Sequence, residues 1–116
     1  MADIKFTSNV NDILRCMEKG KRNALTAIGA TAETHTKENI TADDLIDTGR
    51  LRNSISHTVD GEAAYIGTNV EYAPYLELGT KKIAAHHYLK RAATEHKDEY
   101  KKLTAQAIKS EINNSQ

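Results

Sequence analysis

Apolar side chains recur at steps of three and four in two long stretches, which is the period of a helix with one buried face. In residues 9 to about 39 they are Val10, Ile13, Leu14, Met17, Ala24, Leu25, Ile28 and Ala32. From about Tyr88 to Ile108 they are Leu89, Ala92, Ala93, Tyr100, Leu103, Ala107 and Ile108. The pattern predicts a long helix near each end of the chain. At ~1.5 Å per residue the first helix reaches about 45 Å, so it would overhang a small core and offer surface to a neighbour.

Between the helices the period changes to two. Residues 54–59 and 62–68 alternate, and the dipeptide Asp60-Gly61 between them is typical of a two-residue hairpin turn. The predicted cross-strand pairs are Val59 with Glu62, His57 with Ala64, and Ile55 with Ile66. One face of the hairpin, at about residues 54–68, then gathers Ile55, Val59, Ala64 and Ile66.

A short helix is predicted over about residues 71–78. Asn69 can cap it, Pro74 fits only a first turn, and Gly79 can end it in a left-handed conformation. This helix would present Tyr72, Tyr75 and Leu76 on one side.

These elements predict an α+β fold, with long N-terminal and C-terminal helices packed on a small antiparallel sheet. Residues 48–52 are expected to form a brief turn that leads into the first strand. The length of 116 residues fits one domain over 1–116, with an ordered core over about 5–112. Gly20 and Gly29 weaken the first helix, and either lets another chain approach closely or marks a bend.

Charge narrows the function classes. The chain has 16 basic and 16 acidic residues, so its net charge is zero and a general electrostatic hold on nucleic acid is not expected. A local basic patch could still form from Arg50, Arg52, Lys81, Lys82, Lys90 and Arg91. The alternatives for these residues are an ordinary solvated face and a weak DNA contact.

No stretch has the ~20 apolar residues of a membrane helix, and the first residues lack the apolar core of a signal peptide. We therefore expect a protein that is cytosolic as made and has no membrane partner.

Catalytic and ligand-binding patterns are weak. Cys16 is the single cysteine and lies beside Met17 in an apolar stripe, which indicates packing. His86 and His87 are adjacent and diverge on a helix or strand, and His96 is too distant to complete a metal-binding pair with either. His57 is expected to be a half-buried sheet residue. We expect no catalytic residues, no cofactor and no metal site.

Three segments together carry a resemblance to a known family. They are Asp47-Thr48-Gly49-Arg50-Leu51-Arg52-Asn53-Ser54-Ile55, then Ile66-Gly67-Thr68-Asn69-Val70-Glu71-Tyr72-Ala73-Pro74-Tyr75-Leu76-Glu77-Leu78-Gly79-Thr80, and finally Tyr88-Leu89-Lys90-Arg91-Ala92. Their order and spacing over about residues 47–93 resemble the Hong-Kong-ninety-seven-type gene-product-ten family of tailed-phage tail components. His87 and Arg91 stand where that family commonly has prolines, and Tyr88 replaces a more usual Phe.

The resemblance implies a non-enzymatic virion protein of a tailed phage or prophage. Such a protein would form part of the head–tail joining neck or tail-completion ring around the DNA channel. Its implied partners are further copies of itself and neighbouring neck and tail proteins, while DNA passes through without being specifically bound. The implied location is the virion, with the host cytoplasm during assembly. The alternative is a small DNA-binding or protein-interaction module.

The residues that match the family motif are expected to shape the fold or an oligomer interface. They are Thr48, Gly49, Leu51, Tyr72, Ala73, Tyr75, Glu77, Gly79 and Thr80. Thr48 would cap the turn before the hairpin, and Gly49 and Gly79 would supply backbone freedom. Glu77 could accept from Arg50 or Arg52, within the chain or across a subunit boundary.

Overall fold

The computed structural model describes residues 6–45 and 48–114, with side chains over 11–45 and 48–113. Asp47 of the motif and residue 5, where the core was predicted to start, lie outside these ranges. The elements in order are α1 (Phe6–Asp43), α2 (Thr48–Ser54), β1 (Ser56–Val59), β2 (Ala64–Gly67), α3 (Ala73–Leu78), α4 (Tyr88–Thr94) and α5 (Lys97–Asn114). They confirm the α+β fold, with a long helix at each end and one two-stranded antiparallel sheet.

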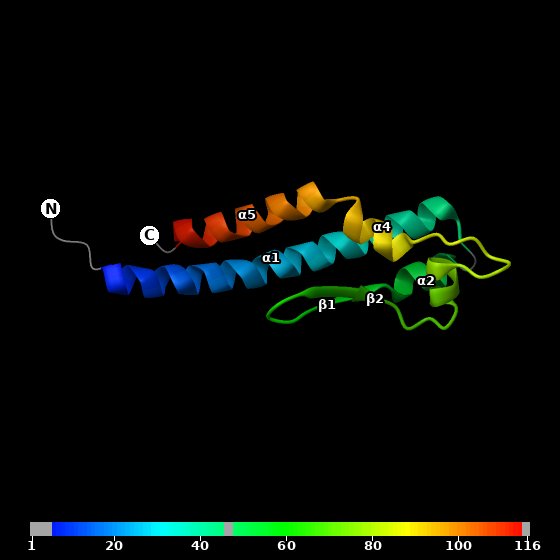
Figure 1. Ribbon diagram of the computed structural model, residues 1–116, viewed down its shortest axis with the longest axis horizontal. Coiled ribbons are helices and arrows are strands. Elements are labelled where there is room, and N and C mark those ends of the chain that lie inside the picture. Colours follow the sequence, from blue (N-terminus) through cyan, green and yellow to red (C-terminus); the bar gives the residue numbers. More distant parts are fainter. Residues whose placement is uncertain (1–5, 46–47, 115–116) are drawn as a thin grey trace.

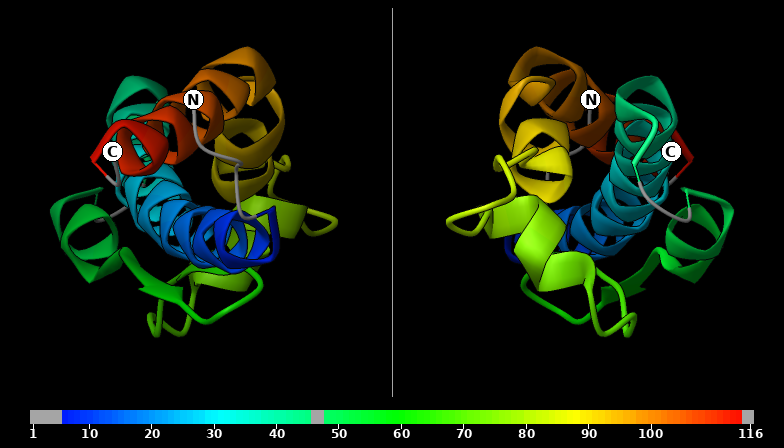
Figure 2. Two further views of the ribbon diagram at one scale, coloured as in Figure 1. Left: turned by 90° about the vertical axis from the view of Figure 1, so that its left-hand side faces the viewer. Right: turned by 90° about the vertical axis from the view of Figure 1, so that its right-hand side faces the viewer.

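Helix α1 is the central element of the fold and contacts α2, α4, α5 and both strands. Its 38 residues, at ~1.5 Å each, span about 57 Å, so it is longer than the sequence pattern predicted. Helix α5 runs back along one side of α1, and the β1–β2 hairpin lies on the opposite side (Figures 1 and 2). The result is an elongated molecule of 72 × 22 × 22 Å in which α1 separates α5 from the sheet.

The main core lies near the C-terminal end of α1. Its buried members are Ile40, Leu45, Leu51, Ile55, Val70, Ala73, Leu76 and Tyr88. Tyr88 is fully buried, and its hydroxyl donates to the carbonyl of Ala73 at 2.7 Å. Because the side chain of Asn39 also donates to the carbonyl of Tyr88, this one residue connects α1, α3 and α4.

The N-terminal half of α1 packs mainly against α5. A Cβ on Gly20 would lie 2.9 Å from the Cα of Ile108, closer than real Cβ atoms approach a backbone. A Cβ on Gly29 would lie 2.8 Å from the His57 ring. Both glycines therefore permit a close approach, but by this chain's own α5 and β1 rather than by another chain.

The hairpin forms with the predicted faces and a different register. The observed pairs are Ser56 with Gly67, His57 with Ile66, Thr58 with Tyr65, and Val59 with Ala64. The predicted two-residue turn is therefore wrong, and the loop spans four residues, Asp60–Ala63. The Asp60 carboxylate accepts from the amides of Glu62 and Ala63, and this local bonding stabilises the longer loop. Since the shift is two residues, each side chain keeps its face.

The predicted helix over 88–108 is two helices, with a break at Glu95 and His96. The hydroxyl of Tyr100 donates to the carbonyl of Ala92 in the last turn of α4. This bond satisfies a carbonyl that the ending helix would otherwise leave unpaired. No apolar residue lies between Ala93 and Tyr100, but this step of seven is close to two helical turns and keeps the apolar positions in phase, so the sequence pattern alone does not reveal the break.

Helix α3 begins later than predicted, and its N-cap residue is Tyr72 without a side-chain cap. The predicted capping role of Asn69 is therefore wrong. Pro74 does lie in the first turn, and Gly79 ends the helix with φ of 81°. The predictions of Pro74 in the first turn and of Gly79 as the helix end are confirmed, whereas the ψ of 166° places Gly79 outside the left-handed helical region.

Candidate functional site

Four motif residues, three in α2 and one in α3, lie in the core or in local turns. Leu51 and Ala73 are buried in the main cluster. Thr48 is the first residue of α2, and its hydroxyl donates to the carbonyl of Leu45. This hydrogen bond connects α2 to the segment that precedes it. Gly49 is exposed, with open space around it. Leu51 and Ala73 therefore shape the fold.

Glu77 joins α3 to the start of α4. Its two carboxylate oxygens accept from the backbone amides of Leu89 at 2.8 Å and Lys90 at 3.1 Å. The first amides of a helix have no partner within that helix, so a carboxylate placed there satisfies them and opposes the helix dipole. The predicted pairing of Glu77 with Arg50 or Arg52 within the chain is wrong, because Arg50 instead donates to Glu71 at 3.1 Å.

Replacing Glu77 with alanine should lower the free energy of unfolding by about 0.5–2 kcal/mol, the usual cost of losing a helix cap. Glu71→Ala is the matched control, since it removes an exposed ion pair and a bond to its own backbone but no helix cap, and should cost about 0–1 kcal/mol. Urea unfolding of the two variants measures the difference. An equal cost for both would contradict the capping role of Glu77.

Thr80 and Gly79 form the turn after α3. The Thr80 amide donates to the carbonyl of Ile83 at 2.7 Å, and its hydroxyl accepts from the amides of Lys82 and Ile83. A Cβ on Gly79 would lie 2.8 Å from the amide nitrogen of Ala85. These two motif residues therefore fix the path of the chain from α3 toward α4.

His87 precedes α4 in a left-handed conformation, with φ of 50°. A proline holds φ near −65° and could not adopt this backbone. The departure from the family pattern at residue 87 therefore coincides with a local conformation that excludes the family's usual residue.

The tyrosines of the motif differ in exposure. Tyr72 is partly buried under the guanidinium of Arg50, which lies 5.5 Å from its ring centroid. Tyr75 and Leu78 are 57% and 71% exposed, whereas Leu76 is buried in the core. The side of α3 that faces solvent therefore carries Tyr75 and Leu78. Tyr72, Tyr75 and Leu76 share one side of the helix as predicted, since they line one small pocket, although Leu76 is buried at its base.

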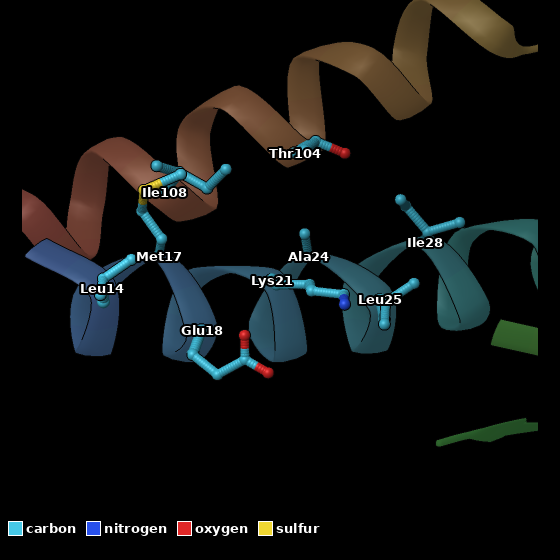
Figure 3. A pocket seen from close by; sticks show the side chains of 9 residues that line it. All are labelled: Leu14, Met17, Glu18, Lys21, Ala24, Leu25, Ile28, Thr104 and Ile108. Atoms are coloured by element: carbon cyan, nitrogen blue, oxygen red, sulfur yellow. The ribbon is translucent and has the colours of Figure 1, made fainter. Parts of the chain in front are cut away.

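A second apolar surface lies at the other end of the molecule, between α1 and α5 (Figure 3). We call it the α1–α5 groove, and it encloses ≈ 380 Å³. Its lining residues are Leu14, Met17, Glu18, Lys21, Ala24, Leu25, Ile28, Thr104 and Ile108. Leu14 and Met17 are 59% and 48% exposed, and Ile13 beside them is 51% exposed. This run of large apolar side chains in solvent is what a binding surface requires.

The sequence pattern did not identify this groove as a functional surface. Its residues form the expected apolar stripe of α1, and such a stripe is usually core. The groove exists because α5 crosses only part of the stripe. Cys16, on the same stretch of α1, is buried as predicted.

The histidines lie in separate clusters. His57 is half-buried in β1, as predicted, and its Nδ1 lies 3.1 Å from a carboxylate oxygen of Glu33. This hydrogen bond is the main reason that the pKa of Glu33 is lowered, with Lys37 contributing further. His86 lies 3.3 Å from Asp43, which also accepts from Arg91 at 2.7 Å. His86 and His87 therefore face different carboxylates, Asp43 and Glu77 respectively.

His35 and His96 come together although 61 positions separate them. Their rings stack in parallel, with centroids 3.5 Å apart and an angle of 1° between the planes. The Nε2 of His35 lies 2.6 Å from a carboxylate oxygen of Glu99. No short-range pattern links α1 to the α4–α5 junction, so sequence reasoning missed this cluster.

The possible basic patch is partly neutralised. Arg50 pairs with Glu71 and Arg91 with Asp43, so both guanidinium groups already have carboxylate partners. This pairing weakens the DNA-contact alternative. No helix among the described residues combines the length and apolar character needed to cross a bilayer.

We compared the chain with models of known protein families, with curated proteins and with solved structures. None of the three comparisons gave a match.

Proposed function

We propose that this chain is a non-enzymatic structural subunit of a tailed phage or prophage. It would assemble with copies of itself and with neighbouring neck and tail proteins into a head–tail joining or tail-completion ring around the DNA channel. The order and spacing of the motif segments over about residues 47–93 support the family part of this proposal. Most of those residues shape the fold, so the motif alone does not define an interface.

The observation that carries the proposal is the α1–α5 groove. Ile13, Leu14 and Met17 are each about half exposed, and Ile112 on α5 is 40% exposed. Apolar surface removed from water gains roughly 25 cal/mol per Å². Covering this groove with a neighbouring subunit would therefore favour assembly.

The second exposed apolar pair, Tyr75 and Leu78 on α3, lies toward the opposite end of the long axis. Two different patches at opposite ends cannot pair within one molecule. Between copies they can make a heterologous contact, the type that closes into a ring when the rotation between subunits allows it. Tyrosine is also enriched at interfaces because it combines a large apolar area with a polar end.

The zero net charge of the chain is compatible with a subunit that surrounds a DNA channel. With 16 basic and 16 acidic residues, the subunit has no net charge with which to hold the phosphate backbone. A ring of such subunits would let DNA pass rather than bind it tightly.

Light scattering and negative-stain microscopy over a concentration series test the proposal. The wild-type chain should associate beyond the dimer at high concentration and form closed rings. Changing Leu14 and Met17 to glutamine keeps good helix formers and removes apolar area. Losing about half the burial energy of each side chain amounts to about 2–3 kcal/mol per contact, or roughly 30- to 150-fold weaker association.

A matched control changes Thr26 and Ala30 to glutamine. Both residues are exposed on α1 and lie outside the groove, so this variant should associate like the wild type. A strict monomer at millimolar concentration that also binds no neck or tail protein would rule out the proposal. If the two double variants associate equally, the α1–α5 groove is not the assembly interface.

A further inference from the structure

We propose that His35, His96 and Glu99 form a binding site for a divalent transition-metal ion of the Zn²⁺ type. In the part of the chain that the structure describes, this is the one group of three metal-ligating side chains whose donor atoms all lie within 4.8 Å of one another. The inference differs from the expectation of no metal site, which considered His86, His87 and their spacing to His96. It does not depend on the proposed ring.

The donor set suits such an ion. Two imidazole nitrogens and one carboxylate oxygen, with a water in the fourth position, are a common tetrahedral arrangement for Zn²⁺. Bonds of about 2.0–2.2 Å place tetrahedral donors about 3.3–3.6 Å apart. His35 and Glu99 are already closer than this, at 2.6 Å, so an ion entering between them would push these two side chains slightly apart.

The two rings are parallel, so their nitrogen lone pairs point side by side rather than at one point. Binding therefore requires the rings to tilt toward the ion. Glu99 is 48% exposed and His96 is partly exposed, so this side of the cluster can adjust and water can reach it. The Tyr100 ring, on α5, packs edge-on against both histidine rings, with ring centroids 6.5 Å from His35 and 6.4 Å from His96.

The backbone places the donors well. His96 directly precedes α5 and Glu99 lies in its first turn, so both donors lie at the same end of that helix. His35 lies on α1, and an ion held by all three would tie α1 to the α4–α5 junction. Because an unfolded chain would not hold these donors together, binding would stabilise the folded protein.

The other described histidines lack this convergence. His57, His86 and His87 each face a carboxylate on another element, namely Glu33, Asp43 and Glu77. Among the described residues, none of these three pairs has a third metal-ligating side chain whose donor atom lies within 4.8 Å of the other two. They therefore provide matched controls for adventitious histidine binding.

Calorimetric titration of the full chain with Zn²⁺ alone tests the site. We expect one ion per chain. His96→Gln and Glu99→Gln should each weaken binding by about tenfold or more, because each removes one of three ligands. His57→Gln should bind like the wild type. Circular dichroism of each variant checks that it folds.

Cu²⁺ electron paramagnetic resonance of the wild-type chain gives a second readout that needs no variant. Coupling to two imidazole nitrogens at one equivalent of Cu²⁺ is expected. Absence of saturable Zn²⁺ binding at millimolar concentration, or binding that His96→Gln leaves unchanged, would overturn the proposal. So would a Cu²⁺ spectrum without coupled nitrogens.

Discussion

Replacing Tyr88 with alanine is expected to lower the free energy of unfolding by about 3–5 kcal/mol, the usual cost of deleting a buried aromatic side chain. Tyr88 is fully buried, and its hydroxyl donates to Ala73 across the core. Domains of this size have a total stability of about 5–15 kcal/mol, so the variant should be close to unfolded. Tyr75→Ala is the control, because Tyr75 is exposed on α3 and its loss should change stability by about 0.5 kcal/mol or less in the monomer.

Denaturant unfolding at low protein concentration measures both variants. A Tyr88→Ala protein as stable as Tyr75→Ala would contradict the central place of Tyr88 in the core.

The same residue also predicts how stability depends on alkaline pH. Burial, and then the negative charge of Glu77, raise the pKa of Tyr88 to about 12. The folded state therefore favours the neutral phenol, whose ordinary pKa is about 10. This contribution is fully present below pH 10 and is lost as the pH rises toward about 12. Tyr88→Phe should be less stable than the wild type at pH 8, and the difference between the two should shrink through this range.

Replacing Gly79 with alanine should also destabilise the fold strongly. Gly79 has φ of 81° and ψ of 166°, a region that is essentially restricted to glycine and costs other residues about 1–3 kcal/mol. The added Cβ would also lie 2.8 Å from the amide nitrogen of Ala85, a backbone atom that cannot rotate away. Overpacking of this kind adds about 1–3 kcal/mol. We therefore expect a total loss of about 2–6 kcal/mol in the free energy of unfolding.

Gly49→Ala is the matched control for this change. Gly49 lies in α2 with open space around it, so an added methyl group meets nothing. Alanine is the better helix former by about 1 kcal/mol, and the variant should be as stable as the wild type or slightly more so. Thermal unfolding of both variants gives the comparison, and a Gly79→Ala protein with wild-type stability would show that the turn can rearrange.

The elements of this fold were predictable where local periodicity determines them. The spacing of apolar residues in α1 and the alternation around Asp60 identified a helix and a hairpin, with the correct faces. The hairpin register was not predicted, because the Asp60 side chain bonds to two backbone amides and lengthens the loop. Such side-chain bonding competes with the turn that the dipeptide favours.

The candidate sites were less predictable, because they depend on contacts between distant segments. Glu77 caps a helix that begins eleven residues later, and His35 meets His96 across two elements. Neither pairing leaves a short-range signature. The α1–α5 groove has a similar origin: its residues were recognised as apolar, but their exposure depends on how far α5 covers α1.

The two halves of the long α1 helix are packed against different numbers of neighbouring elements. Its C-terminal half is surrounded by α2, α4 and the hairpin, whereas its N-terminal half is supported mainly by α5. Opening of the outer turns therefore does not require the cluster around Tyr88 to come apart, and the two halves can belong to separate cooperative units. The less protected unit is the one that carries the groove. If another subunit binds there, it would also restrict the motion of α1 and α5. The conformational entropy lost by the two helices would offset part of the binding free energy.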